Sequence, residues 1–140
     1  MIINIKLLAA CLVAGAVYII IIDRLWNMLE KHIPVFHGFP ESLVEDKSSA
    51  WYVSSFIVEY IFFVLLPAVI YGWFYTVIPF SGIRGGVAVG LYLFLFGMIP
   101  VAILTMFRIK IPAVYVLYLL TGLFLRAVGS MMIIGYLYSL

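Results

Sequence analysis

An arginine and a glutamate lie within long apolar stretches of this chain and could form a charged site inside a membrane. Arg126 is the only charged residue between positions 112 and 138, and Glu59 is the only acid well inside an apolar stretch. A charged side chain at the bilayer centre costs at least ~3 kcal/mol, so Arg126 needs a partner, a water-filled cavity or a function. Glu59 is the best candidate partner. The sequence predicts a Glu59–Arg126 pair that either fixes helix register or belongs to an ion, substrate or proton path.

Small residues share the predicted helix face that carries Arg126. Spacing of i, i+4, i+7 and i+8 places four residues on one side, namely Gly122, Arg126, Gly129 and Ser130. Counting inward from a shared membrane side puts Glu59 roughly 8 Å shallower than Arg126, a gap that an arginine side chain mostly covers. Because loss of one partner strands the other charge, we expect Arg126→Leu to lower assembly unless Glu59→Gln accompanies it. An acid, lipid headgroup or cofactor in another subunit is the alternative partner.

A second stripe of small residues enters the third apolar stretch. Its glycines are spaced by four, four and seven residues, at Gly82, Gly86, Gly90 and Gly97. Glycines at such spacing lie on one helix face and let two backbones approach closely. The stripe therefore predicts helix packing, either within this chain or at a seam with another subunit. Gly122 and Gly129 carry the same expectation for the last helix.

Composition and hydropathy place these residues in a membrane protein. The 140 residues are 67% hydrophobic and 10% charged, whereas soluble domains are about 45–50% apolar and about 25% charged. Four apolar stretches have the ~20 residues that a membrane-spanning helix needs, at about 2–22, 56–78, 87–107 and 112–138. We predict one all-α integral membrane domain over 1–140, with four transmembrane helices. Pro67 and Pro100 should kink the second and third helices unless neighbours satisfy the freed carbonyls.

The polar segment 23–50 is the only sizeable part expected outside the bilayer. Apolar and polar residues separate onto two sides over 24–33, which predicts a short interfacial amphipathic helix after the first span. Pro34 should end that helix because proline cannot donate a backbone N–H. Tryptophans often lie at membrane interfaces, and three are predicted anchors, Trp26, Trp51 and Trp73.

The distribution of basic residues predicts the orientation of the chain. One side of the membrane receives Lys6 and Arg84, which lie near a chain end and in the 79–86 turn. The other side receives five basic residues, Arg24, Lys31, Lys47, Arg108 and Lys110. Cytoplasmic loops carry the excess of Lys and Arg. We therefore expect the 23–50 segment to be cytoplasmic and both termini to lie outside.

Several functional classes lack their usual residues. The net charge is +2 without a basic cluster, so no nucleic-acid partner is expected. A single cysteine, Cys11, excludes a disulfide or a Cys-based metal site within one chain; we interpret it as a packing residue, with lipid attachment as the alternative. The two histidines, His32 and His37, lie outside the spans, so no intramembrane haem ligand is expected. They are interpreted as interfacial residues, with a surface metal site as the alternative.

Two functions fit this pattern. The first is an accessory or structural subunit of a larger membrane complex, which packs through its glycine faces and the Arg–Glu pair. The second is a small homo-oligomeric transporter or channel that uses Glu59 and Arg126. No nucleophile–base pair stands out, so we expect no enzymatic activity from the chain alone and no required cofactor. A bound lipid, quinone or carotenoid is compatible with the first function, and the expected partners are membrane lipid, other membrane subunits or further copies of this chain.

Overall fold

Four long helical spans make up the protein in a computed structural model that describes residues 4–34, 39–43 and 46–140. The first span is α1 (Ile5–Glu30) and the fourth is α6 (Ala113–Leu137). The second comprises α2 (Ser49–Tyr60), the π-helical turn η2 (Ile61–Leu65) and α3 (Leu66–Phe74). The third comprises α4 (Gly82–Tyr92), the π-helical turn η3 (Leu93–Met98) and α5 (Ile99–Arg108). A 3₁₀ turn, η1 (Glu41–Leu43), lies between the first two spans.

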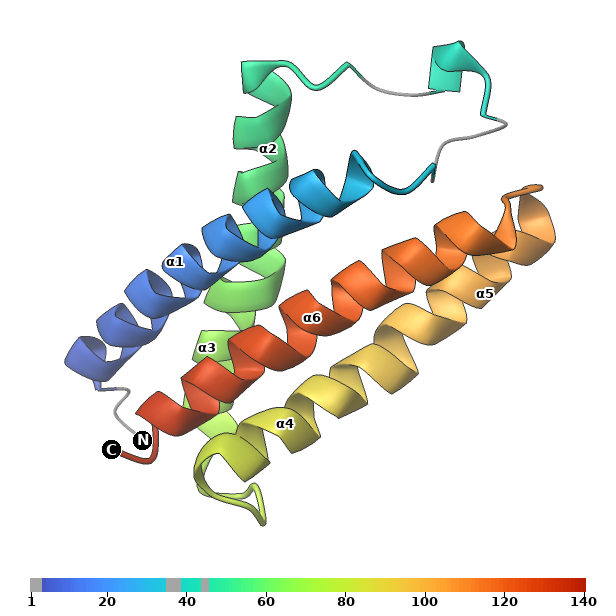
Figure 1. Ribbon diagram of the computed structural model, residues 1–140. Coiled ribbons are helices and arrows are strands. Elements are labelled where there is room, and N and C mark those ends of the chain that lie inside the picture. Colours follow the sequence, from blue (N-terminus) through green and yellow to red (C-terminus); the bar gives the residue numbers. More distant parts are fainter. Residues whose placement is uncertain (1–3, 35–38, 44–45) are drawn as a thin grey trace.

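The predicted four-helix membrane fold is confirmed. All four spans are long and apolar enough to cross a bilayer, and the described residues contain no strand. The start of α1 and the end of α6 lie at one end of the bundle, and the end of α1 and the start of α2 lie towards the other (Figure 1). The chain is thus an integral multi-pass membrane protein. Which end faces the cytoplasm stays a prediction.

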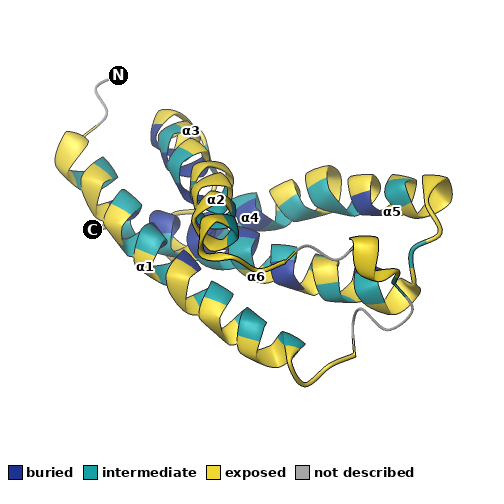
Figure 2. Cartoon of the chain, turned by 90° about the horizontal axis from the view of Figure 1, so that it is seen from above, coloured by how far each residue is buried: buried dark blue, intermediate teal, exposed yellow. Residues whose placement is uncertain are grey.

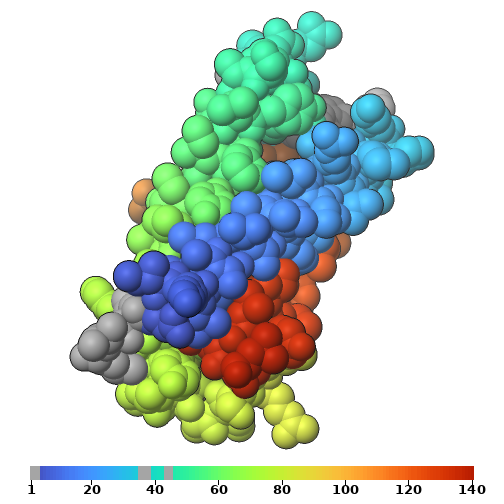
Figure 3. Space-filling view, turned by 90° about the vertical axis from the view of Figure 1, so that its left-hand side faces the viewer, coloured from blue at the N-terminus to red at the C-terminus, as the bar shows by residue number. Residues whose placement is uncertain are grey.

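The last span, α6, is the central helix of the bundle. It contacts α1, α3, η2 and the whole third span, and Figure 1 shows it between α1 and the α4–α5 arm. Its buried residues recur along its length, at Val116, Gly122, Ala127, Val128, Ser130, Met131, Ile134 and Gly135. Figure 3 shows α1 lying between α2–α3 and the end of α6 on this face of the molecule. Loss of contacts to α6 should therefore affect every other span.

The tightly packed core lies towards the end of the bundle that holds the start of α1 and the end of α6. Five buried residues form it, namely Cys11, Ala68, Tyr71, Met131 and Ile134. Figure 2 shows the buried positions gathered where α3, α4 and α6 meet, with α5 and the outer side of α1 largely exposed. The Cys11 side chain is fully buried in this core. This position fits the expected packing role of the cysteine.

The first helix is longer than predicted. The amphipathic stretch at 24–33 does not begin a separate interfacial helix, because α1 continues without a break to Glu30. Charged residues do not by themselves end a helix, and the first proline after α1 is Pro34. The inward side of the stretch packs on α6, where the Trp26 ring stacks on the ring of Tyr118 at a centroid distance of 4.9 Å. The prediction of a separate helix was therefore wrong.

The helix ends also differ from the ends of the apolar stretches that revealed them. The second span begins at Ser49 rather than near 56, because the Ser48 hydroxyl caps it by accepting a hydrogen bond from the Trp51 N–H at 3.2 Å. It ends at Phe74 rather than 78, and the third begins at Gly82 rather than 87. Hydropathy marks the part of a helix that lies in hydrocarbon, whereas capping residues set the helix ends.

Each intramembrane proline follows a π-helical turn. The Leu66 N–H bonds the Ile61 carbonyl just before Pro67, and the Ile99 N–H bonds the Phe94 carbonyl just before Pro100. These i to i−5 bonds widen the backbone where a proline ring would otherwise meet the carbonyl four residues earlier. In both spans, a π-helical turn thus makes room for the proline ring.

Glycines bring α4 and α6 into backbone contact. A Cβ atom at Gly86 would overlap the Met131 carbonyl oxygen, and one at Gly90 would lie 2.9 Å from the Val128 Cα. From the other helix, a Cβ at Gly135 would lie 2.8 Å from the Gly86 Cα. The two helices can approach this closely only because these positions lack side chains.

Two members of the predicted stripe behave differently. Gly82 begins α4 with a φ of +63°, a conformation that favours glycine, and its carbonyl oxygen lies against Gly135. Gly97 is exposed, and nothing lies within 4 Å of a Cβ built on it. Gly97 therefore does not pack against another helix of this chain, and its alternative role at a seam with another subunit stays a prediction. The π-helical turn η3 changes the helical register between Gly90 and Gly97, so a separation of seven residues no longer places the two glycines on one face.

Candidate functional site

Two acidic side chains from two other spans meet the guanidinium of Arg126. The Arg126 Nε donates to Glu59 Oε2 at 2.6 Å, and its Nη2 donates to Asp23 Oδ1 at 2.7 Å. The acids come from α2 and α1, and the arginine comes from α6. Such short, charge-assisted bonds are the strong class of protein hydrogen bond. We call Asp23, Glu59 and Arg126 the charged cluster.

The antiparallel register of α1 and α6 positions one half of the cluster. Along α6, Gly129 makes room for the Tyr18 ring, whose hydroxyl donates to the Leu125 carbonyl at 2.7 Å. Two turns away, Gly122 accommodates the Trp26 indole and the Arg126 guanidinium, each 3.0 Å from where its Cβ would lie. These fitted contacts on either side hold α1 so that Asp23 faces Arg126. Gly122 and Gly129 thus serve the packing that their spacing predicted.

The second span brings in Glu59. The chain of α2, η2 and α3 runs obliquely to α1 and α6 rather than alongside them (Figure 1). At this crossing the Glu59 carboxylate and the Arg126 guanidinium are in direct contact. Ser55, one turn before Glu59, donates to Glu59 Oε1 at 3.5 Å. Both carboxylate oxygens of Glu59 therefore have a partner.

The cluster carries one more negative charge than positive when all three groups are ionised. Two carboxylates face one guanidinium, so one positive charge offsets only one of the two negative charges. The side chains are 11% exposed at Arg126, 22% at Asp23 and 20% at Glu59, too little for full hydration. The arrangement can lock three helices together.

A second polar cluster lies nearer the end of α1. Lys47 Nζ pairs with Glu30 Oε2 at 2.5 Å and donates to Asn27 Oδ1 at 3.1 Å. The Tyr118 hydroxyl of α6 also donates to Glu30 Oε2, at 3.2 Å. Polar groups therefore continue from the charged cluster along α1 towards the side where α2 begins. On the other side of Arg126 the apolar core closes the bundle.

Comparison with known proteins adds no homologue to this geometry. The chain matches no protein-family model, no curated protein and no solved structure. The site is therefore interpreted from its own residues.

Asp23 is the member of the cluster that sequence reasoning missed. The sequence assigns it to the polar segment 23–50, because the apolar stretch stops just before it. The signal was helical spacing, since the buried positions of α1 continue into polar ones at Cys11, Gly15, Ile19, Asp23, Trp26 and Glu30. A stripe that runs from buried apolar residues into acids indicates a continuous helix face. Read in this way, Asp23 faces the bundle rather than the membrane surface.

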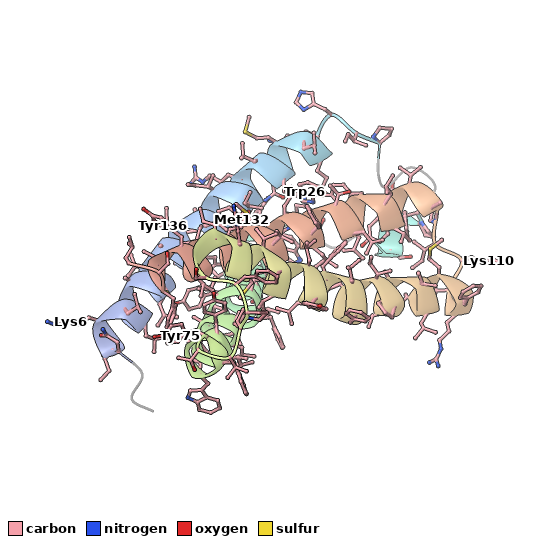
Figure 4. All side chains as sticks on the ribbon, turned by 90° about the horizontal axis from the view of Figure 1, so that it is seen from below. Lys6, Trp26, Tyr75, Lys110, Met132 and Tyr136 are labelled. Atoms are coloured by element: carbon pink, nitrogen blue, oxygen red, sulfur yellow. The ribbon has the colours of Figure 1, made fainter. Side chains whose placement is uncertain are left out.

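The predicted tryptophan anchors divide into two kinds. Trp26 is half-buried against α6 (Figure 4) and belongs to the bundle as much as to an interface. Trp73 is 56% exposed near the end of α3, and Trp51 lies in the first turn of α2 beneath the Lys47 ammonium, 5.7 Å from the ring centroid. The exposed Trp73 and the partly exposed Trp51, both near span ends, suit a membrane interface.

The described residues contain no group of three His, Cys, Asp or Glu side chains that could hold a metal ion. Of the two histidines considered for a surface metal site, His37 lies outside the described residues. The ring Nδ1 of His32 lies 2.9 Å from the Met28 carbonyl oxygen of the same helix end. That contact explains the orientation of His32 without a metal.

Two apolar cavities lie apart from the charged cluster. One of about 240 Å³ lies between α5 and α6, and another of about 440 Å³ lies between α3 and α4 over the middle of α6. Gly97 and Met98 line both cavities. None of the three charged residues lines either one. Neither cavity therefore opens onto the charged cluster.

Proposed function

We propose that this protein is an accessory subunit of a larger membrane assembly, with the charged cluster as the internal clamp of its bundle. The observation that carries the proposal is that Arg126 finds both of its ion-pair partners within its own chain. An arginine that lined a substrate path would need to face a cavity, and the two described cavities are lined by other residues. The proposal assigns no catalytic step to the chain.

The third span supplies the surface for partner helices in this proposal. In the second part of this span, α5 buries only Ala102, and η3 buries no residue. Large side chains on it are exposed, with Phe96 at 74% and Phe107 at 84%. In a bilayer such a face meets either lipid or another protein, and a helix held by one neighbour is free to pack on a second.

Purification from the native membrane tests this proposal. We expect a tagged copy, extracted in mild detergent and measured by native mass spectrometry, to co-migrate with unrelated membrane subunits at fixed stoichiometry. The matched control is an unrelated four-span protein with the same tag and expression level, which should bring none of these subunits. A protein that is recovered only as a monomer or a homo-oligomer contradicts the subunit proposal.

Proton or cation transport is a second candidate, favoured by the excess negative charge of the cluster. Asn27, Glu30, Lys47 and Tyr118 extend polar groups from this cluster towards one membrane side. Under this candidate, proteoliposomes with a pH gradient should dissipate it faster with the protein than without, and Asp23→Asn should slow that flux at least about tenfold. Glu41→Gln is the matched control, because Glu41 is an exposed acid outside the spans. Flux equal to that of empty liposomes removes this candidate.

A further inference from the structure

The cavity between α5 and α6 is an apolar groove that extends about half the depth of a bilayer. It runs from Gly97 and Ala102 past Thr105 to Ile111 on one wall, with Tyr115 and Leu119 of α6 on the other. From Gly97 to the end of α5 the helix rises about 16 Å, whereas the hydrocarbon core is about 30 Å thick. The groove therefore matches one leaflet in length.

The lining of the groove suits hydrocarbon rather than a polar ligand. Its one hydroxyl from the third span, Thr105 Oγ1, already donates to the Val101 carbonyl at 2.8 Å. The remaining lining residues are apolar or lack a side chain, apart from Tyr115, whose ring lies in the wall formed by α6. Water gains nothing in such a site, and apolar cavities without polar partners stay dry.

Two basic residues stand at the outer end of the groove. Arg108 follows Thr105 by about one helical turn, and Lys110 directly precedes Ile111, so both lie close in the chain to lining residues at this end, although neither lines the cavity itself. Figure 4 shows Lys110 at the turn between α5 and α6. Both residues are exposed, and within the described parts of the chain neither forms an ion pair. The groove thus has an apolar interior, and two positively charged residues without ion-pair partners lie beside its outer end.

We propose that this groove binds one anionic glycerophospholipid, with an acyl chain between α5 and α6 and the phosphate at Arg108 and Lys110. Basic residues at the membrane surface attract anionic headgroups, and a headgroup above an apolar groove satisfies both parts of the site at once. The second cavity continues from Gly97 and Met98, so a long chain has space beyond the end of the first. This assignment is independent of the proposed subunit function.

Lipid retention in native mass spectrometry tests the assignment. The protein would be reconstituted in nanodiscs of phosphatidylglycerol and phosphatidylcholine with identical acyl chains, then released in mild detergent. We expect about 25-fold greater retention of phosphatidylglycerol, which falls to the phosphatidylcholine level in the Arg108→Gln/Lys110→Gln variant. Each basic residue near a lipid surface accounts for about fivefold of such a preference. Lys6→Gln/Arg84→Gln is the matched control, because Lys6 lies at the opposite end of the bundle (Figure 4).

A second variant tests the groove itself. Gly97→Leu places a side chain where the two cavities meet, and it meets no atom within 4 Å of its Cβ, so the fold should tolerate it. We expect it to lower retention of both lipids at least about fivefold, whereas Ala9→Leu on the exposed side of α1 changes neither. Equal retention of the two lipids by the wild-type protein overturns the proposal. Unchanged retention in Gly97→Leu also overturns it, because the lipid would then be held by charge alone.

Discussion

Arg126→Leu is expected to remove most of the folded protein, with a loss of about 3–5 kcal/mol in the free energy of unfolding. The substitution leaves the carboxylates of Asp23 and Glu59 facing each other without the guanidinium that contacts both at 2.6–2.7 Å. Neither side chain is exposed enough for water to replace the arginine. The measurement is the yield of monodisperse protein and its thermal unfolding in one detergent, followed by circular dichroism.

The rescue pattern distinguishes a cluster of three from a simple pair. Arg126→Leu/Glu59→Gln still leaves Asp23 charged, so we expect only partial recovery. Adding Asp23→Asn to that variant removes the last stranded charge and should restore most of the stability. Arg84→Leu is the matched control, since Arg84 is an exposed arginine of α4 without an ion-pair partner in the described residues. Equal losses in the single, double and triple variants would contradict direct pairing.

This revised pattern shows which parts of the site are encoded locally in the sequence. A lone arginine in an apolar stretch requires a counter-charge wherever the helices pack, so Glu59 could be found from energy alone. Asp23 could not be found from hydropathy, because an acid at the end of an apolar stretch resembles the membrane surface. Its role depends on where α1 stops, and that depends on contacts such as Trp26 with Tyr118 that form between distant residues.

The glycine stripe is a case in which the sequence pattern predicted a contact that does not form within the chain. A spacing of four or seven residues places glycines on one face only if the helix is a regular α-helix. The helix is regular from Gly86 to Gly90. The regularity fails at η3, where the turn before Pro100 widens and shifts the following residues around the helix axis. A proline reveals that a helix is disturbed, but the sequence does not say whether it kinks or forms a π turn. Gly97 consequently belongs to the cavities rather than to the α4–α6 contact.

The α4–α6 contact gives the second large prediction. We expect Gly86→Ala to destabilise the protein by about 3 kcal/mol, near the upper end of the usual cost of overpacking. The added methyl group would overlap the Met131 carbonyl oxygen, and a helix backbone cannot turn that atom aside as a side chain could. The helices must separate, which also opens the contact between Gly86 and Gly135. The observable is a lower midpoint of thermal unfolding in detergent.

Gly97→Ala is the control for this prediction within the same span. It makes the same chemical change, but nothing lies within 4 Å of the new methyl group. Alanine is favoured over glycine in a helix by about 1 kcal/mol, so this variant should be neutral or slightly more stable. If Gly86→Ala and Gly97→Ala behaved alike, backbone contact between α4 and α6 could not be what holds the third span. A large difference instead locates that attachment at Gly86, because the two variants differ only in what the methyl group meets.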